Sequence, residues 1–99
     1  MKRVIAILEP EAKLTVKDLN DLYHEKIDEA SNDPNTHFVV SHKFSFALRY
    51  LEKKRFRNVT VYHMLGAEEK HPFKKKDGFS SIIELREALL QDSTECIFT

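Results

Sequence analysis

Two histidines are placed where a parallel sheet would bring their side chains to one edge. His42 follows the apolar run 38–40, and His63 lies near the end of the apolar run 59–65. If these runs are neighbouring parallel strands, both imidazoles lie at the carboxyl edge of the sheet, where open α/β sheets bind ligands. Glu9, which follows an earlier apolar run, would lie at the same edge. Two imidazoles and a carboxylate are groups that bind zinc or transfer protons.

These three residues come from separate segments and lack the spacing of a metal or catalytic motif. Polar residues commonly end strands, so this simpler interpretation is favoured over a zinc site or a His/Glu hydrolase. We therefore expect no metal site, no catalytic residue and no cofactor. Cys96 lies in an apolar run and is expected to fill a small buried space rather than to act as a nucleophile.

The strongest local charge feature is a run of three lysines. Lys74, Lys75 and Lys76 follow Phe73 within residues 66–78, which we expect to form a polar loop. Such a loop could close over a phosphate or contact an acidic partner, although a merely solvated loop is the favoured alternative. The candidate ligand-binding residues are His42, Lys43, Ser45, His63, Lys74, Lys75 and Lys76.

Two aromatic residues of the second expected helix are candidates for an interface. Phe46 and Tyr50 are four positions apart and lie on a different face from the apolar stripe of that helix. They form either an exposed strip suited to a dimer or a protein partner, or a contact with a neighbouring helix. The sequence leaves both interpretations open.

Strands alternating with helices must position these residues. Apolar runs at 4–8, 38–40, 59–65 and 95–98 are typical of strands buried on both faces of a parallel sheet. Apolar residues at helical spacing separate them, and Thr15 with Asp18 and Ser81 with Glu84 predict capping boxes. Residues 1–99 are therefore expected to form one three-layer Rossmann-like α/β domain. Its sheet would be four-stranded and mainly parallel, in the order 3-2-1-4, with three helices.

The composition limits the classes of function. The 99 residues include sixteen acidic and sixteen basic side chains, interspersed along the chain. This balance argues against general nucleic-acid binding driven by charge. The single cysteine indicates a reducing compartment, so a cytoplasmic location is expected. The first ten residues are too few for a membrane span and lack a signal-peptide cleavage site, so no membrane association is expected.

One stretch resembles a known family. The sequence "HFVVSHKFSFALRYLEKKRFRNVTVYHM", residues 37–64, resembles the middle of small bacterial Rossmann-like proteins of the SLOG superfamily, most specifically at "NVTVYHM". Residues 77–98 are similar to the next helix and strand of that family. The resemblance implies a Rossmann-like fold that binds a nucleotide-like ligand at the carboxyl ends of its strands.

The chain departs from this family at the glycines that admit a phosphate. Residues 8–13 and 41–45 contain no glycine, and the glycine-rich element that holds a catalytic glutamate would fall after residue 99. Glycine serves there because a backbone without Cβ can approach a phosphate closely. We therefore expect a non-enzymatic interaction or regulatory protein with a protein partner or a homodimer, such as an inhibitor from a phage or mobile element. The alternatives are a nucleotide-binding module and, more weakly, a hydrolase.

Overall fold

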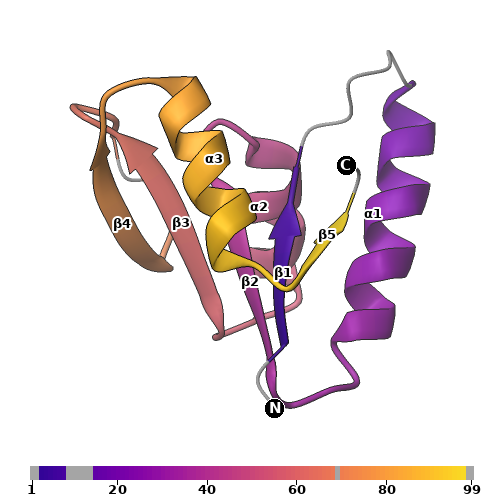
Figure 1. Ribbon diagram of the computed structural model, residues 1–99. Coiled ribbons are helices and arrows are strands. Elements are labelled where there is room, and N and C mark those ends of the chain that lie inside the picture. Colours follow the sequence, from indigo (N-terminus) through magenta and orange to yellow (C-terminus); the bar gives the residue numbers. More distant parts are fainter. Residues whose placement is uncertain (1–2, 9–14, 69, 98–99) are drawn as a thin grey trace.

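A parallel sheet forms the middle layer of the protein (Figure 1). The computed structural model describes residues 3–8, 15–68 and 70–97, and within these ranges the sheet has five strands in the order β4-β3-β2-β1-β5. Each neighbouring pair is parallel. The predicted α/β fold is confirmed, but the sheet has one strand more than expected. The strands are β1 (Arg3–Ile7), β2 (Thr36–Ser41), β3 (Val59–Met64), β4 (Lys74–Phe79) and β5 (Glu95–Ile97).

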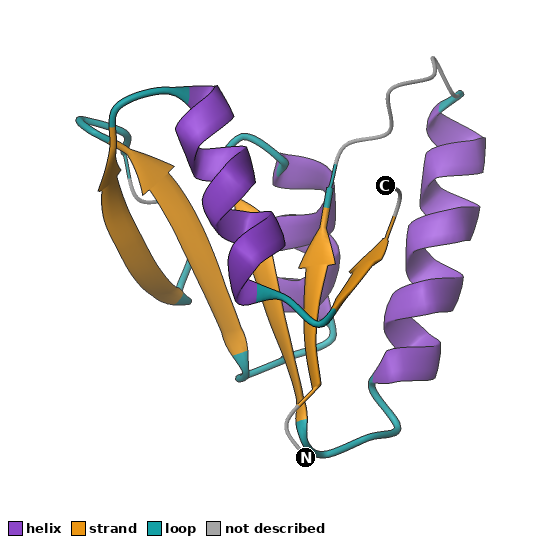
Figure 2. Ribbon diagram, viewed as in Figure 1, coloured by secondary structure: helices purple, strands orange, loops and turns teal. Residues whose placement is uncertain are grey.

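Helices cover both faces of this sheet (Figure 2). The helices α1 (Val16–Ala30) and α2 (Ser45–Lys53) pack on one face, and α3 (Ile82–Asp92) packs on the other. Apolar side chains alternate between the two faces along each central strand, and two buried clusters result. None of the helices in the described parts of the chain is long and apolar enough to cross a membrane.

Polar side chains begin two of the helices as the sequence predicts. The Thr15 hydroxyl accepts a hydrogen bond from the Asp18 N–H, and the Ser81 hydroxyl accepts one from the Glu84 N–H. These bonds satisfy amides that have no partner within the helix. The Glu84 carboxylate accepts from the N–H of Ser80 rather than from that of Ser81, so the second capping box is shifted by one residue.

The prediction of a loop over residues 66–78 is wrong in its second half, because residues 74–79 form the edge strand β4. A turn at Met64–Ala67, with Gly66 at a φ of +78°, reverses the chain after β3. Phe73 then enters the core between the sheet and the α1–α2 layer, where it is 8% exposed. This buried ring fixes the start of β4 beside β3.

A bulge lies at the far end of β4. Tyr62 pairs with Lys76 and Met64 pairs with Phe79, so β4 has one residue more than β3 between these two pairs. Gly78 has a φ of +99°, a conformation that residues with a Cβ rarely adopt. The bulge therefore lies opposite His63.

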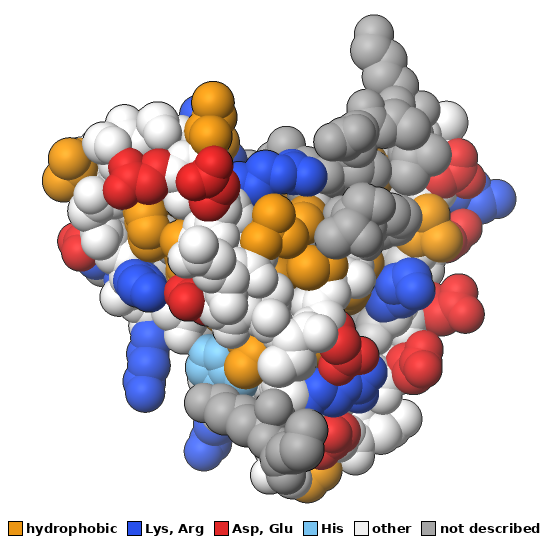
Figure 3. Space-filling view, in the orientation of Figure 1, with side chains coloured by type: hydrophobic (Ala, Val, Ile, Leu, Met, Phe, Trp, Pro, Cys, Tyr) orange, Lys and Arg blue, Asp and Glu red, His pale blue; other side chains and the backbone are white. Residues whose placement is uncertain are grey.

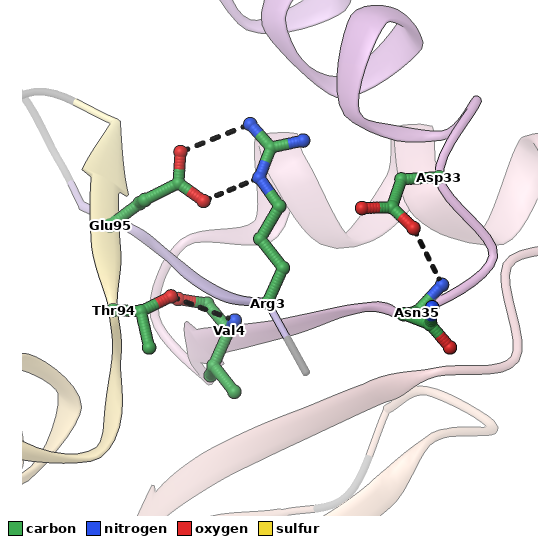
Figure 4. Close-up of polar contacts among 6 residues, drawn as sticks. All are labelled: Arg3, Val4, Asp33, Asn35, Thr94 and Glu95. Carbon is green, nitrogen blue, oxygen red and sulfur yellow. Dashed lines mark hydrogen bonds and ion pairs between the residues drawn. The ribbon is translucent and has the colours of Figure 1, made fainter. Parts of the chain in front are cut away.

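Strand β5 is held at the opposite edge of the sheet by polar contacts near the amino end of β1 (Figure 4). The Arg3 guanidinium pairs with the Glu95 carboxylate, with Nη2 3.0 Å from Oε1. The Val4 N–H donates to the Thr94 hydroxyl at 3.0 Å. Cys96 is half-buried in this strand, and its Sγ lies 3.7 Å from Ser93 Oγ. These contacts compensate for the shortness of a three-residue strand.

If Phe73 anchors β4, Phe73→Ala should destabilise the protein by about 3 kcal/mol, because it removes a large side chain from a packed core. The free energy of unfolding in urea measures this change, and amide hydrogen exchange should show that residues 74–79 lose protection. Lys74→Ala, which alters an exposed side chain of the same strand, should change stability by less than about 0.5 kcal/mol. A cost below about 1 kcal/mol for Phe73→Ala, with β4 still protected, would contradict this account.

Candidate functional site

The pairing of β2 with β3 brings two histidines together. Val40 pairs with Val61, and the His42 N–H donates to the Tyr62 carbonyl at 2.9 Å. Because side chains alternate along a strand, His42 and His63 lie on the same face of the sheet as the two valines. Their rings stack with centroids 5.1 Å apart. The predicted meeting of these two imidazoles at the carboxyl edge is therefore present in the structure.

A third histidine joins them from the connection between β3 and β4. His71 Nε2 lies 2.7 Å from His63 Nε2, and His71 Nδ1 accepts a hydrogen bond from the Phe73 N–H at 3.2 Å. His63 is 1% exposed and His71 is half-buried, so this contact is partly buried. His71 is not among the predicted ligand-binding residues, because its place depends on the path of the chain from the Gly66 turn to the Phe73 anchor.

These histidines line a pocket of about 460 Å³, hereafter the histidine pocket. The volume is within the range of small-molecule sites, roughly 300–1,000 Å³. The walls are α2, the ends of β2 and β3, and the connection that follows β3. The other lining residues are Ser45, Leu48, Arg49, Glu52, Ala67, Glu68 and Lys70.

The charges of the histidine pocket are mixed. Arg49 and Lys70 are cationic and Glu52 and Glu68 are anionic, while Lys70 Nζ lies 3.9 Å from Glu68 Oε2. Burial, aided by the nearby charge of Lys43, lowers the pKa of His42 below 6.5. Both effects favour the neutral form of the His42 ring. Its Nε2 is buried and has no hydrogen-bond partner among the described residues.

The described side chains do not form a metal site. No group of three or more His, Cys, Asp or Glu side chains in the described ranges is arranged to hold a metal ion. The rings of His42 and His63 stack, whereas ligands of one ion would direct a nitrogen to a common point. Glu9, the carboxylate proposed beside them, lies outside the described residues.

The structure divides the predicted ligand-binding residues among separate surfaces. His42, Ser45 and His63 line the histidine pocket. Lys43 instead lines a smaller hollow of about 90 Å³ on the α3 side of the sheet. Figure 3, viewed from that side, shows apolar side chains exposed beside α3. The hollow is lined mainly by Ile7, Leu8, Phe44, Ile82, Leu85 and Leu89.

The three lysines of β4 do not reach the histidine pocket. Register with β3 places Lys74 and Lys76 on the α3 face of the sheet and Lys75 on the opposite face. Lys76 lies over the Tyr62 ring and pairs with Asp92, with Nζ 3.0 Å from Oδ2. The Tyr62 hydroxyl also donates to Asp92, and these two partners lower the pKa of that carboxyl. Lys75 Nζ lies 3.6 Å from Asp77.

Phe46 and Tyr50 lie between α1 and α2, which agrees with the helix-contact interpretation. Both are half-buried against the core, and the Tyr50 ring stacks on His24 with centroids 3.7 Å apart. The Tyr50 hydroxyl donates to Asp28 at 2.6 Å. Burial and this bond raise the pKa of Tyr50 to about 12. These contacts place Tyr50 against α1 of the same chain.

Comparison with known proteins gives no further guide to this site. No protein-family model, curated protein or solved structure matches the chain.

The electrostatics predict how His42 responds to pH. Its imidazole should titrate below 6.5, and Lys43→Ala should raise the midpoint by removing a nearby positive charge. Because the folded state favours the neutral ring, the stability that His42 contributes is complete above pH 6.5 and is lost as the pH falls through the folded pKa. Imidazole resonances followed by NMR measure the midpoint, and Lys74→Ala is the control. A midpoint at or above 6.5 in the unaltered protein would contradict the prediction.

Proposed function

We propose that this protein is a non-enzymatic regulatory domain that binds a small phosphate-bearing ligand, such as a nucleotide derivative, in the histidine pocket. The observation that carries the proposal is the pocket itself. It has the volume of a ligand site, it lies at the carboxyl edge of a parallel sheet, and polar groups from three segments of the chain converge in it.

The lining side chains suit a ligand that carries both acceptors and donors. The Arg49 guanidinium offers a fork of N–H donors that matches phosphate geometry, and Lys70 and the Ser45 hydroxyl add further donors. The carboxylates of Glu52 and Glu68 accept hydrogen bonds instead. A nucleoside phosphate supplies phosphate oxygens to the first group and ribose or base donors to the second.

Side chains rather than main-chain amides would hold the phosphate. The turn from Ser41 to Ser45 is closed by a hydrogen bond from the Phe44 N–H to the Ser41 carbonyl, and Phe44 is buried beside it. A glycine at this turn would leave room for a phosphate against the backbone. The crowded turn therefore supports a ligand position deeper along α2, beside Arg49.

The resemblance of residues 37–64 to SLOG proteins supports the same edge of the sheet as the site, with the phosphate-admitting glycines lost. In this proposal the protein is a degenerate member of that superfamily and acts in the cytoplasm. Cys96, a free thiol, supports a reducing location. A regulatory role, including that of a small inhibitor carried by a phage or mobile element, fits a pocket without an evident nucleophile.

A thermal-shift screen tests ligand binding. At a hundredfold excess over Kd, a nucleoside phosphate should stabilise the protein by about 2.7 kcal/mol and raise Tm by about 10 °C or more. Arg49→Ala should weaken binding at least about tenfold, because it removes a charged hydrogen-bond donor. Lys76→Ala changes a cation on the other face of the sheet and should leave binding unaltered. No shift with any nucleotide, or equal losses in both variants, would contradict the proposal.

A second candidate function is self-association through exposed apolar side chains. Leu65 and Ile83 are 70% and 69% exposed, and Ile82 is 42% exposed. The Leu65 N–H donates to the Phe79 carbonyl, so Leu65 lies beside the end of β4, close to the start of α3. Exposed apolar groups so close together favour a contact with a second copy or another protein.

If this surface forms a homodimer, light scattering should show a mass that rises with protein concentration. Leu65→Ser combined with Ile83→Ser should hold the protein monomeric, because the exposed apolar area is replaced by polar groups. Val16→Ser, which alters an apolar side chain 62% exposed at the start of α1, is the control and should not change the mass. A monomer at every concentration would rule out the homodimer.

A further inference from the structure

Two hydrogen bonds at the histidine pocket, from Phe73 to His71 and between His71 and His63, together favour one arrangement of protons. The Phe73 N–H donates to His71 Nδ1, so that nitrogen carries no proton. The neutral His71 ring therefore carries its proton on Nε2 and donates it to His63 Nε2, 2.7 Å away. His63 Nε2 is then an acceptor, and the neutral His63 ring carries its proton on Nδ1.

One further proton breaks one of these hydrogen bonds wherever it binds. A proton on His63 Nε2 would face the N–H of His71, and a proton on His71 Nδ1 would face the N–H of Phe73. In both cases two donors oppose each other and one hydrogen bond is lost. Because His63 is buried, the added charge also lacks the solvation that water gives to an exposed imidazolium.

We propose that protons open the histidine pocket: uptake of one proton by the His63–His71 pair releases residues 70–72, hereafter the strap, from β3. The strap carries Lys70 and His71 on the wall of the pocket and ends at the Phe73 anchor. Opening would therefore widen the site. The opening itself does not depend on the proposed function. Only the identity of the ligand that it would release rests on that function.

Charged groups of both signs surround the His63–His71 pair, and the carboxylates among them can accept a protonated His71 that has turned outward. From the end of β2, His42 stacks on His63, and α2 presents Arg49 and Glu52. The connection itself supplies Lys70 and Glu68, and on β4 Lys75 pairs with Asp77 near the protein surface. An outward-turned His71 imidazolium could then pair with Glu52 or Glu68.

Hydrogen exchange of the Phe73 amide reports directly whether the Phe73–His71 hydrogen bond is intact, because that N–H is its donor. In the ligand-free full-length protein, the protection factor of Phe73, corrected for intrinsic exchange, should fall about tenfold between about pH 7.5 and 5.5. In His71→Asn, an amide oxygen accepts from Phe73 but does not titrate, so protection should not depend on pH. His24→Asn, on α1, should respond as the unaltered protein does. Protection that is constant with pH in the unaltered protein, or a loss that persists in His71→Asn, would overturn the proposal.

The tautomers of the unaltered protein give a test that needs no variant. Long-range proton–nitrogen NMR spectra at about pH 7.5 should show His71 protonated at Nε2 and His63 protonated at Nδ1. The opposite tautomers would overturn the proposal. Neither measurement uses a nucleotide, so a failure to bind nucleotides would not contradict this inference. Conversely, Phe73 protection that does not change with pH would contradict the inference but not the proposed ligand binding.

Discussion

The parallel register of β2 and β3 brings His42 and His63 together, and the rest of the histidine pocket is arranged around this pair. Because Val40 lies beside Val61, the next residues on the same face are His42 and His63. A shift of one residue in this pairing would place one imidazole on the α3 face and leave the other alone. The register is fixed by the core, where Phe38, Val40, Val59 and Val61 are all fully buried against α1 and α2.

Elements with an apolar face could be predicted from the sequence, and polar ones could not. The central strands and α1 were evident because burial on one or both faces imposes a pattern on apolar residues. Strand β4 has no such pattern, because Lys74, Lys75, Lys76 and Asp77 are exposed on an edge. Lysines on an edge strand hinder pairing with other chains, so their presence there is ordinary. Phe73, just before the strand, and Phe79, at its end, pack this segment against the core.

Residues of the histidine pocket that lie on patterned strands could also be predicted, whereas those on the irregular connection could not. His42 and His63 follow from strand order and from alternation of side chains along each strand. The places of His71 and Lys70 depend on how the chain between β3 and β4 folds back toward Arg49 on α2, which no periodic pattern records. The prediction that the lysines of β4 belong to the site depends on that segment being a loop, whereas it is a strand. Once the segment is a strand, register places two of them on the opposite face of the sheet.

The turn after β2 contains no glycine, and the histidine pocket lies farther along α2; one structural explanation covers both observations. A parallel sheet places its strand ends at one edge whether or not the backbone there can receive a phosphate. In this chain the turn after β2 is filled by Phe44, and the open space lies farther along α2, lined by side chains. In the proposed function, imidazole and guanidinium groups would replace main-chain amides in holding the ligand. The affinity would then depend on side-chain charge.

The most direct test of the ligand site is to map amide chemical-shift changes while nucleoside monophosphates are added to the unaltered protein. The account predicts that the largest changes fall on His42, Ser45, Arg49 and Lys70, around one pocket. Changes confined to the lysines of β4 or to the hollow beside α3, or no change at millimolar nucleotide, would contradict it.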